Sequence, residues 1–370
     1  MAPDEHDEKA ALRADPAKRL RDLLTPRDQA HVKLMERLKA LYVETERDER
    51  LAAEMQRMIE NATQRRDPSR PYGIGNRREG MALGIIAESG AGKSRAMLHY
   101  LKDNPYFPNY GVPRSGCQLI TVGAKAPCLL RTLGMETLRG AAYHAQRELP
   151  ETEAWSLARF QIQHQIILFV HFEELQRVIQ QKNRNERKKI VETLAGLLTD
   201  ETWPWHLILS GLPAMRALFE EADVNLDDHD TLRRRTRFVE FSPIDPKGDS
   251  KVLDSALKQY EKIAGVSLEV ARQPEMRARH CHAAARQLGL FFELTVLALD
   301  ACLRARRKKV TRQDFEAAYA ARTLAPYDLN PFFSPQWETI DTSVIQNTQP
   351  ETESKPSRRK GERRRFKDDE

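Results

Sequence analysis

Hydrophobic side chains recur at helical spacing through the first 70 residues. One apolar face is formed by Val32, Met35, Leu38, Leu41 and Tyr42, and a second by Leu51, Met55, Met58 and Ile59. The sequence "RDPSRPYGIGNRREG" (66–80) then breaks the pattern with proline and glycine, which predicts a loop. We therefore expect an N-terminal helical region over residues 1–70.

Five short, almost continuously apolar runs follow the loop. They are Met81–Ala87, 117–124, Ile166–Val170 continuing towards Phe172, 205–213 and 237–243. Such runs are typical of strands that are buried on both faces of a parallel sheet. Helical patterns separate them, among them "SRAMLHYL", "PCLLRTLGMETLRGAAY" and "RKKIVETLAGLL". The alternation predicts βαβ units, and hence an α/β core with a parallel sheet over 71–245.

From about residue 246 the strand pattern stops, and four helical segments follow. Thr311 is a candidate N-cap of the last one, with Asp314 three residues later. We expect a helical lid over 246–328. Beyond it, we expect residues 329–370 to form a linker and a basic disordered tail, because hydrophobic periodicity is lost there. The last sixteen residues, 355–370, hold eight basic and four acidic side chains.

Composition narrows the class of protein. The chain has 370 residues, of which 31% are charged, and no apolar run approaches the length of a membrane span. The N-terminus lacks an apolar core, and the four cysteines form no CxxC pair, which argues against a secretory signal, a disulfide framework and a zinc ribbon. We expect a cytoplasmic protein without a membrane partner. The net charge of +6 permits a polyanionic partner, and the tail is either a solvated segment or a phosphate contact.

A glycine-rich turn lies between the first predicted strand and a predicted helix. It reads "AESGAGKS", residues 87–94, the context and ending of a phosphate-binding loop. Gly90 and Gly92 suit its unusual dihedrals, Lys93 supplies charge, and the Ser94 hydroxyl is a Mg²⁺ ligand. Ala87 replaces a glycine of the pattern, which is tolerated at a strand exit if its φ is negative. A chance glycine-rich turn is the alternative. The candidate nucleotide contacts are Ala87, Glu88, Ser89, Gly90, Ala91, Gly92, Lys93, Ser94 and Arg95.

Polar residues end two further strands. Glu173 and Glu174 close the apolar run of the third strand, and Ser210 closes that of the fourth. We assign Glu173 to Mg²⁺ and Glu174 to activation of the attacking water, and Ser210 to orienting that water. The alternatives are a carboxylate pair that starts a helix and a serine that ends a strand.

Four arginines, Arg233, Arg234, Arg235 and Arg237, precede the fifth strand. An arginine presented to a neighbour's nucleotide stabilises charge in phosphoryl transfer. Arg237 is the preferred candidate and Arg234 the second, whereas the other interpretation is a solvated basic face.

In this order, the motifs resemble the AAA+ ATPases. Within them, the chain is similar to the TniB/TnsC-type transposition regulators, which are related to the IstB and MuB ATPases. The resemblance covers roughly residues 80–335. It rests on "AESGAGKS", "APCLLRTLGMETLRGAAY", "FEELQRV", "LILSGLPAMRALF", "RRRTRFVEF", "LGLFFELTVLALDACLRARRKKVTRQDFEAAY" and "NPFF". Two positions depart from the pattern: Glu173 stands where aspartate is usual, and Phe292 and Glu293 stand where many lids carry an arginine.

The resemblance implies an ATPase that uses ATP and Mg²⁺. It also implies a ring or helical filament of identical subunits on double-stranded DNA, with a transposase and a target-selection protein as partners and hydrolysis dismantling the polymer. Lys125, Arg131 and Arg139 are the candidate DNA contacts, or else ordinary surface charges. The alternatives are another AAA+ or STAND-type switch with a protein client, and a small-molecule kinase, which would not explain the trailing helices.

Overall fold

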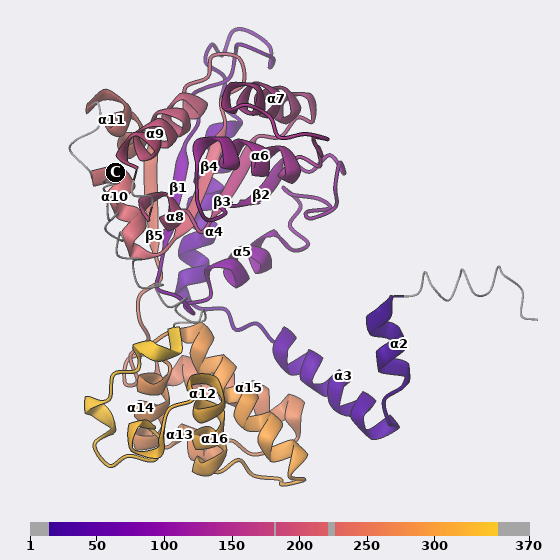
Figure 1. Cartoon of the computed structure of the whole chain (residues 1–370), viewed down its shortest axis with the longest axis vertical. Helices are drawn as coiled ribbons and strands as arrows, with labels where there is room; N and C mark the ends of the chain where they lie inside the picture. The colour runs from indigo at the N-terminus through magenta and orange to yellow at the C-terminus, as the bar shows by residue number, and fades with distance from the viewer. Residues whose placement is uncertain (1–14, 181–182, 221–225, 347–370) are drawn as a thin grey trace, which may run out of the picture.

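The computed structural model describes residues 15–180, 183–220 and 226–346. An α/β core and a helical lid lie end to end along the long axis of the molecule (Figure 1). Within the described ranges, no helix is long and apolar enough to cross a bilayer.

The core is built on a five-stranded sheet in the order β2-β3-β4-β1-β5, and every pairing is parallel. The strands are β1 (Ala82–Ile86), β2 (Leu119–Gly123), β3 (Phe169–Glu173), β4 (His206–Gly211) and β5 (Thr236–Glu240). Every residue of β1 and β4 is buried, as the continuous apolar runs predict. Because all strands are parallel, their carboxyl ends meet at one edge of the sheet.

One strand begins later than its apolar run suggests. Ile166 is 59% exposed and has a φ of 59°, and it belongs to the turn that ends α7 (Glu151–His164). The backbone N–H of Ile167 still donates to the Ile162 carbonyl, 2.9 Å away. The first residues of the apolar run therefore belong to the end of α7, and β3 starts only at Phe169.

Helices cover both faces of the sheet (Figure 1). On one face lie α4 (Glu46–Ala62) and α5 (Lys93–Leu101), whose apolar side chains form one core cluster with the sheet. The other face packs against a second cluster. Its helices are α6 (Leu130–Gly140), α7 (Glu151–His164), α8 (Gln176–Ile179), α9 (Arg184–Leu198), α10 (Ala217–Glu220) and α11 (Leu226–Arg235). The predicted α/β class is confirmed.

The lid has a separate apolar core. It contains α12 (Ser250–Ala264), α13 (Glu269–Arg272), α14 (Pro274–Ala283), α15 (Leu288–Arg304) and α16 (Arg312–Thr323). The Thr311–Asp314 capping box at the start of α16 is present, as predicted. The N-terminal helix α3 (Pro26–Ala40) also belongs here, because Leu38 is fully buried in the lid cluster, and α2 (Pro16–Asp22) precedes it. The N-terminal helices are thus divided, with α3 on the lid and α4 on the core.

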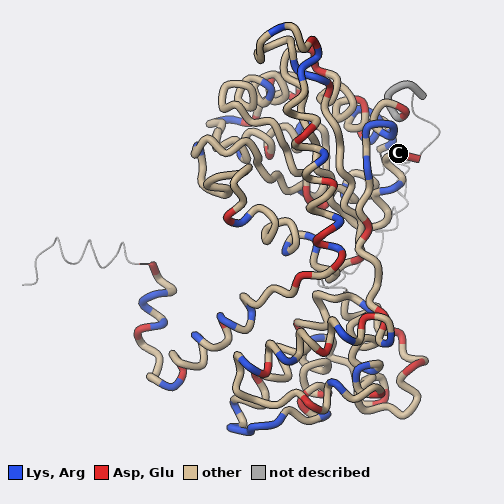
Figure 2. Tube along the Cα trace, turned by 180° about the vertical axis from the view of Figure 1, so that it is seen from behind, with Lys and Arg blue, Asp and Glu red and all other residues tan. Residues whose placement is uncertain are grey.

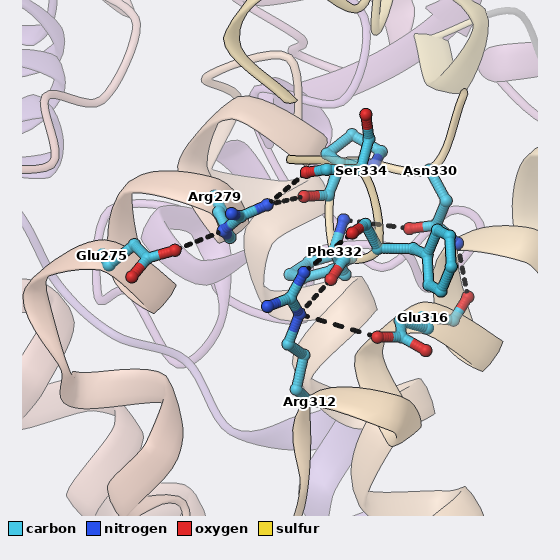
Figure 3. A network of polar contacts seen from close by, with 9 residues as sticks. Glu275, Arg279, Arg312, Glu316, Asn330, Phe332 and Ser334 are labelled. Carbon is cyan, nitrogen blue, oxygen red and sulfur yellow. Dashed lines mark hydrogen bonds and ion pairs between the residues drawn. The ribbon is translucent and has the colours of Figure 1, made fainter. Parts of the chain in front are cut away.

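Residues 329–346, expected to be linker, instead pack on the lid. Phe332 and Ile345 are buried in its core. The Arg279 guanidinium donates to the carbonyls of Pro331 and Ser334, each at 2.8 Å, and Arg312 donates to the Phe332 carbonyl (Figure 3). The anchoring apolar residues are too sparse to give a periodic pattern, which is why the sequence suggests a linker. Residues 347–370, including the predicted basic tail, lie outside the described residues.

Three buried histidines predict a loss of stability in mild acid. Burial lowers the pKa of His171, His206 and His280 to about 3 each, against about 6.5 in an unfolded chain. Between these values the unfolded chain binds protons that the folded chain does not, so the free energy of unfolding falls as the pH drops below about 6.5. Each histidine contributes about 1.4 kcal/mol per pH unit.

Urea unfolding between pH 7.5 and 5 checks this expectation. We expect His280→Phe, within an aromatic cluster, to reduce the pH slope by about one proton, whereas His164→Phe, at the exposed end of α7, retains the wild-type slope. An unchanged slope in His280→Phe would contradict the prediction.

Candidate nucleotide site

The glycine-rich loop leaves β1 at the carboxyl edge of the sheet and enters α5 at Lys93. Gly90 and Gly92 have φ of 79° and 99°, left-handed values that glycine adopts without strain. Ala87 is not among the residues with positive φ, and its methyl group is buried against the core on the α4–α5 side. An alanine therefore fits at the strand exit, as the sequence predicts. The loop presents its backbone N–H groups at the start of a helix, which is a favourable place for phosphate.

Lys93 is folded against its own loop. Its Nζ donates to the carbonyls of Ala87 at 2.6 Å and Glu88 at 3.2 Å. Burial lowers the pKa of the ammonium, while the charges of Glu174, Glu88 and Glu173 act in the opposite direction. The fold thus places the Lys93 ammonium close enough to the Glu173 and Glu174 carboxylates for their charges to interact.

Glu173 is the last residue of β3, and Glu174 follows it with a φ of 60°. The Glu174 side chain is half exposed, and its Oε2 accepts a 2.9 Å hydrogen bond from the Gln176 amide. Gln176 is buried, and its Oε1 accepts from the backbone N–H of Leu212 at 3.1 Å. One amide therefore connects the second carboxylate to the loop that follows β4.

Arg177 connects the same carboxylate to a third loop. Its Nη1 donates to the Ala124 carbonyl at 2.7 Å, just after β2, and its Nη2 lies 3.8 Å from Glu174 Oε2. Glu174 is consequently held between side chains tied to the loops after β2 and β4.

Ser210 lies on β4 beside Ile85 of β1, and its hydroxyl is buried. It is 2.9 Å from His171 Nε2, and His171 Nδ1 is 3.4 Å from the Thr121 hydroxyl. The depressed pKa of His171 keeps the ring neutral, so it offers one donor and one acceptor. A polar row therefore crosses three strands and reaches Ser210, near the edge where Glu173 lies.

The lid is in direct contact with the glycine-rich loop. The Leu290 N–H, in the first turn of α15, donates to the Gly90 carbonyl at 3.2 Å. A largely apolar pocket opens beside this contact. Its walls come from the linker between α3 and α4, from the loop and the start of α5, and from the lid; they include Leu41, Tyr42, Val43, Ala91, Gly92, Arg95, Phe241, Leu288 and Phe292.

Two basic residues near this pocket are committed to backbone carbonyls. Arg95 donates to the carbonyls of Lys39 and Leu41, both within 2.6 Å, and so fixes the linker. Arg286 donates to Ile244 at 3.0 Å, at the hinge between core and lid, rather than reaching the loop. Phe292, at the position where many lids carry arginine, forms part of the apolar wall instead.

The oxygen ligands at this edge suit Mg²⁺. The Ser94 hydroxyl and the Glu173 carboxylate are hard ligands of the kind that Mg²⁺ takes alongside phosphate oxygens. No group of three or more histidine, cysteine or acidic side chains suited to a metal occurs among the described residues. A magnesium ion here would therefore take only one or two ligands from these side chains, and the nucleotide and water would supply the others.

Arg237 lies at the opposite edge of the sheet from the loop. It pairs with Leu83 on β1, and its guanidinium is exposed, 3.8 Å from Glu54. Four residues of strand, about 13 Å, separate Leu83 from the loop at Ala87. Arg234, the second candidate, lies in the last turn of α11 on the same side. Neither arginine is placed to reach the nucleotide loop of its own chain.

The three predicted DNA contacts are all ion-paired. Lys125 Nζ lies 2.9 Å from Glu136, which also pairs with Arg139, and Arg131 lies 2.9 Å from Glu148. These side chains are about half exposed, so the pairs are weak, yet they reduce the local positive charge.

The motifs assign no role to several residues near the site. Tyr42 is predicted only as part of a helical face and Phe292 only as a departure from the lid pattern, yet both line the apolar pocket. The sequence gives only a weak indication of a role for His171, because it is a lone polar residue in an apolar strand. Gln176 has no distinguishing local pattern.

No protein-family model matches the chain, and no curated protein matches it in sequence. Among solved structures, it is similar to the Aeropyrum pernix ORC1 protein in complex with DNA, with a TM-score of 0.53, 12% identity, and coverage of 78% of this chain and 67% of that one. It is also similar to Cdc6p from Pyrobaculum aerophilum, with a TM-score of 0.49, 13% identity, and coverage of 76% and 69%. At such identities, the likeness to ORC1 establishes the fold alone, that of a parallel α/β core followed by a helical lid.

Proposed function

We propose that this chain is an AAA+ ATPase that regulates DNA transposition. It binds ATP, assembles on double-stranded DNA without sequence preference, and recruits or activates a transposase, and hydrolysis then drives disassembly. The observation that carries the nucleotide part is the meeting of Lys93, Glu173 and Glu174 at the carboxyl edge of the sheet, where the lid contacts the loop. The transposition part is supported by the resemblance of the motifs to TniB/TnsC-type regulators.

In this proposal, each residue at the edge has a separate task. Lys93 exchanges the carbonyls of its own loop for phosphate oxygens, which are stronger acceptors because they are charged. Ser94 and Glu173 hold Mg²⁺, which neutralises phosphate charge when bound. Glu174 accepts a proton from the attacking water, and Ser210 orients that water.

Hydrolysis in this scheme needs a second copy of the chain. Because Arg237 lies at the far edge of the sheet, it reaches a nucleotide only by entering a neighbour's site. Each subunit would then supply the loop on one face and the arginine on the other. Such a head-to-tail contact generates a ring or a helical filament.

A switch ATPase with a protein client is the second candidate. It is favoured by the ion pairs that engage Lys125, Arg131 and Arg139, the residues expected to contact DNA. A client made of protein would not require these charges to be free.

Electron microscopy of the full chain with duplex DNA, with and without a non-hydrolysable ATP analogue, tests the proposal. We expect filaments or rings on the duplex only when the analogue is present. Analogue-dependent oligomers that form equally well without DNA, and leave added DNA bare, would favour the switch with a protein client.

A further inference from the structure

A strongly basic cavity, separate from the apolar pocket described above, lies at the amino edge of the sheet, remote from the glycine-rich loop. Its volume is about 550 Å³, and Gly80 and Met81, at the entrance to β1, form part of its floor. The remaining lining residues are Asn61, Glu79, Arg66, Arg78, Arg234, Arg235 and Arg237. Basic residues are visible on the loop between α4 and β1 and on α11 (Figure 2). Five arginines and one glutamate therefore surround a single cavity.

The loop that supplies one wall has an internal framework. Asn76 is 3% exposed, and its amide nitrogen lies within hydrogen-bond distance of the carbonyls of Asp67, Arg70 and Pro71. Its Oδ1 accepts from the Asp67 N–H at 2.8 Å. A single buried side chain thus organises the segment 67–76, so the arginines on either side are presented by an ordered backbone.

The loop contains two pairs of consecutive arginines, 65–66 and 77–78. In each pair, the first arginine packs on an aromatic ring and the second lines the cavity. Arg65 and Arg77 form an antiparallel bridge, and their guanidiniums lie over the rings of Tyr72 and Trp203, at 5.1 and 4.3 Å. Side chains alternate along extended chain. The next residues, Arg66 and Arg78, accordingly face the other way, are exposed and line the cavity.

The opposite wall comes from the end of α11 and the start of β5. Arg235 pairs with Glu79, which is the one carboxylate that lines the cavity among the described residues. Within the part of the chain that the structure describes, Arg66, Arg78 and Arg234 form no ion pair. Positive charge therefore remains on both walls.

We propose that this cavity binds the phosphate backbone of nucleic acid, with Arg66 and Arg78 as its principal contacts. The inference rests on the proposed function and adds a DNA-contacting surface to it. A guanidinium matches phosphate geometry with two parallel N–H donors. The terminal phosphate of a nucleotide bound to a neighbouring subunit would contact a single arginine. A nucleic-acid backbone, in contrast, presents successive phosphates to arginines on both walls of the cavity. Contacts of this kind are independent of sequence and sensitive to salt.

Fluorescence anisotropy of a labelled mixed-sequence duplex, titrated with the full chain at several NaCl concentrations, tests the assignment. We expect Arg66→Ala/Arg78→Ala to lower the slope of log affinity against log salt by about two, close to one for each phosphate contact. The matched control Lys258→Ala/Lys262→Ala removes two exposed charges from α12 and should retain the wild-type slope. Arg66→Lys/Arg78→Lys should restore most of it, because lysine also binds phosphate as a point charge.

The outcomes separate this inference from the proposed function. If the wild-type chain does not bind the duplex, the proposed function fails. If the wild type binds and the alanine pair has the same slope, the cavity is not a DNA contact. If the alanine pair binds DNA normally but no longer assembles with the ATP analogue, the arginines contact another copy of the chain, and the DNA assignment is overturned.

Discussion

Lys93→Ala is expected to abolish ATP-dependent assembly. The side chain supplies the only ammonium of the loop, and each charge-assisted hydrogen bond to phosphate is worth about 1.5–3 kcal/mol. Two such bonds correspond to a loss of roughly 100-fold or more in ATP affinity. A fluorescent ATP analogue measures the affinity, and light scattering or electron microscopy measures assembly.

Lys102→Ala is the matched control, because Lys102 is exposed and caps the other end of the same helix. It should bind ATP and assemble as the wild type does. Equal thermal unfolding midpoints would show that both variants are folded. Normal ATP-driven oligomers in Lys93→Ala would place the nucleotide elsewhere.

Glu174→Gln is expected to bind ATP normally and to remain assembled. The amide has almost the shape of the carboxylate but does not accept a proton, and general-base catalysis contributes typically 10²–10⁴-fold. We therefore expect phosphate release to slow by about that factor, while complexes formed with ATP persist as though the analogue were present. Steady-state phosphate release and the lifetime of assembled complexes are the two measurements.

Glu201→Gln, an exposed carboxylate in the turn before β4, serves as its control and should turn over ATP at the wild-type rate. Unchanged turnover in Glu174→Gln would remove this residue from the catalytic role. Faster disassembly than in the wild type would contradict the link between hydrolysis and release.

The strands and the loop are predictable because their signals are local. The apolar run before Ala87, the glycines at 90 and 92 and the Lys93–Ser94 ending lie within a few residues of one another. The carboxylates at the end of β3 are predictable for the same reason. Parallel strands then bring these separate segments to one edge, which is a consequence of topology rather than of any single motif.

Features that depend on remote segments are not predictable in this way. Tyr42 and Phe292 meet only because α3 packs on the lid while α4 packs on the core. The packing of residues 329–346 rests on single anchors such as Phe332, which give no period. The start of β3 is displaced because Ile166, although apolar, turns the chain with a positive φ.

Gly289 determines how this chain can be divided into fragments. A Cβ at that position would lie 2.5 Å from the Gly90 carbonyl oxygen, so the backbones of lid and loop are in direct contact. A fragment ending after β5 would keep the glycine-rich loop and lose the Leu288 and Phe292 walls of the apolar pocket. This pocket is therefore a property of the undivided chain, and amide hydrogen exchange at Leu290 would report whether the two parts remain in contact.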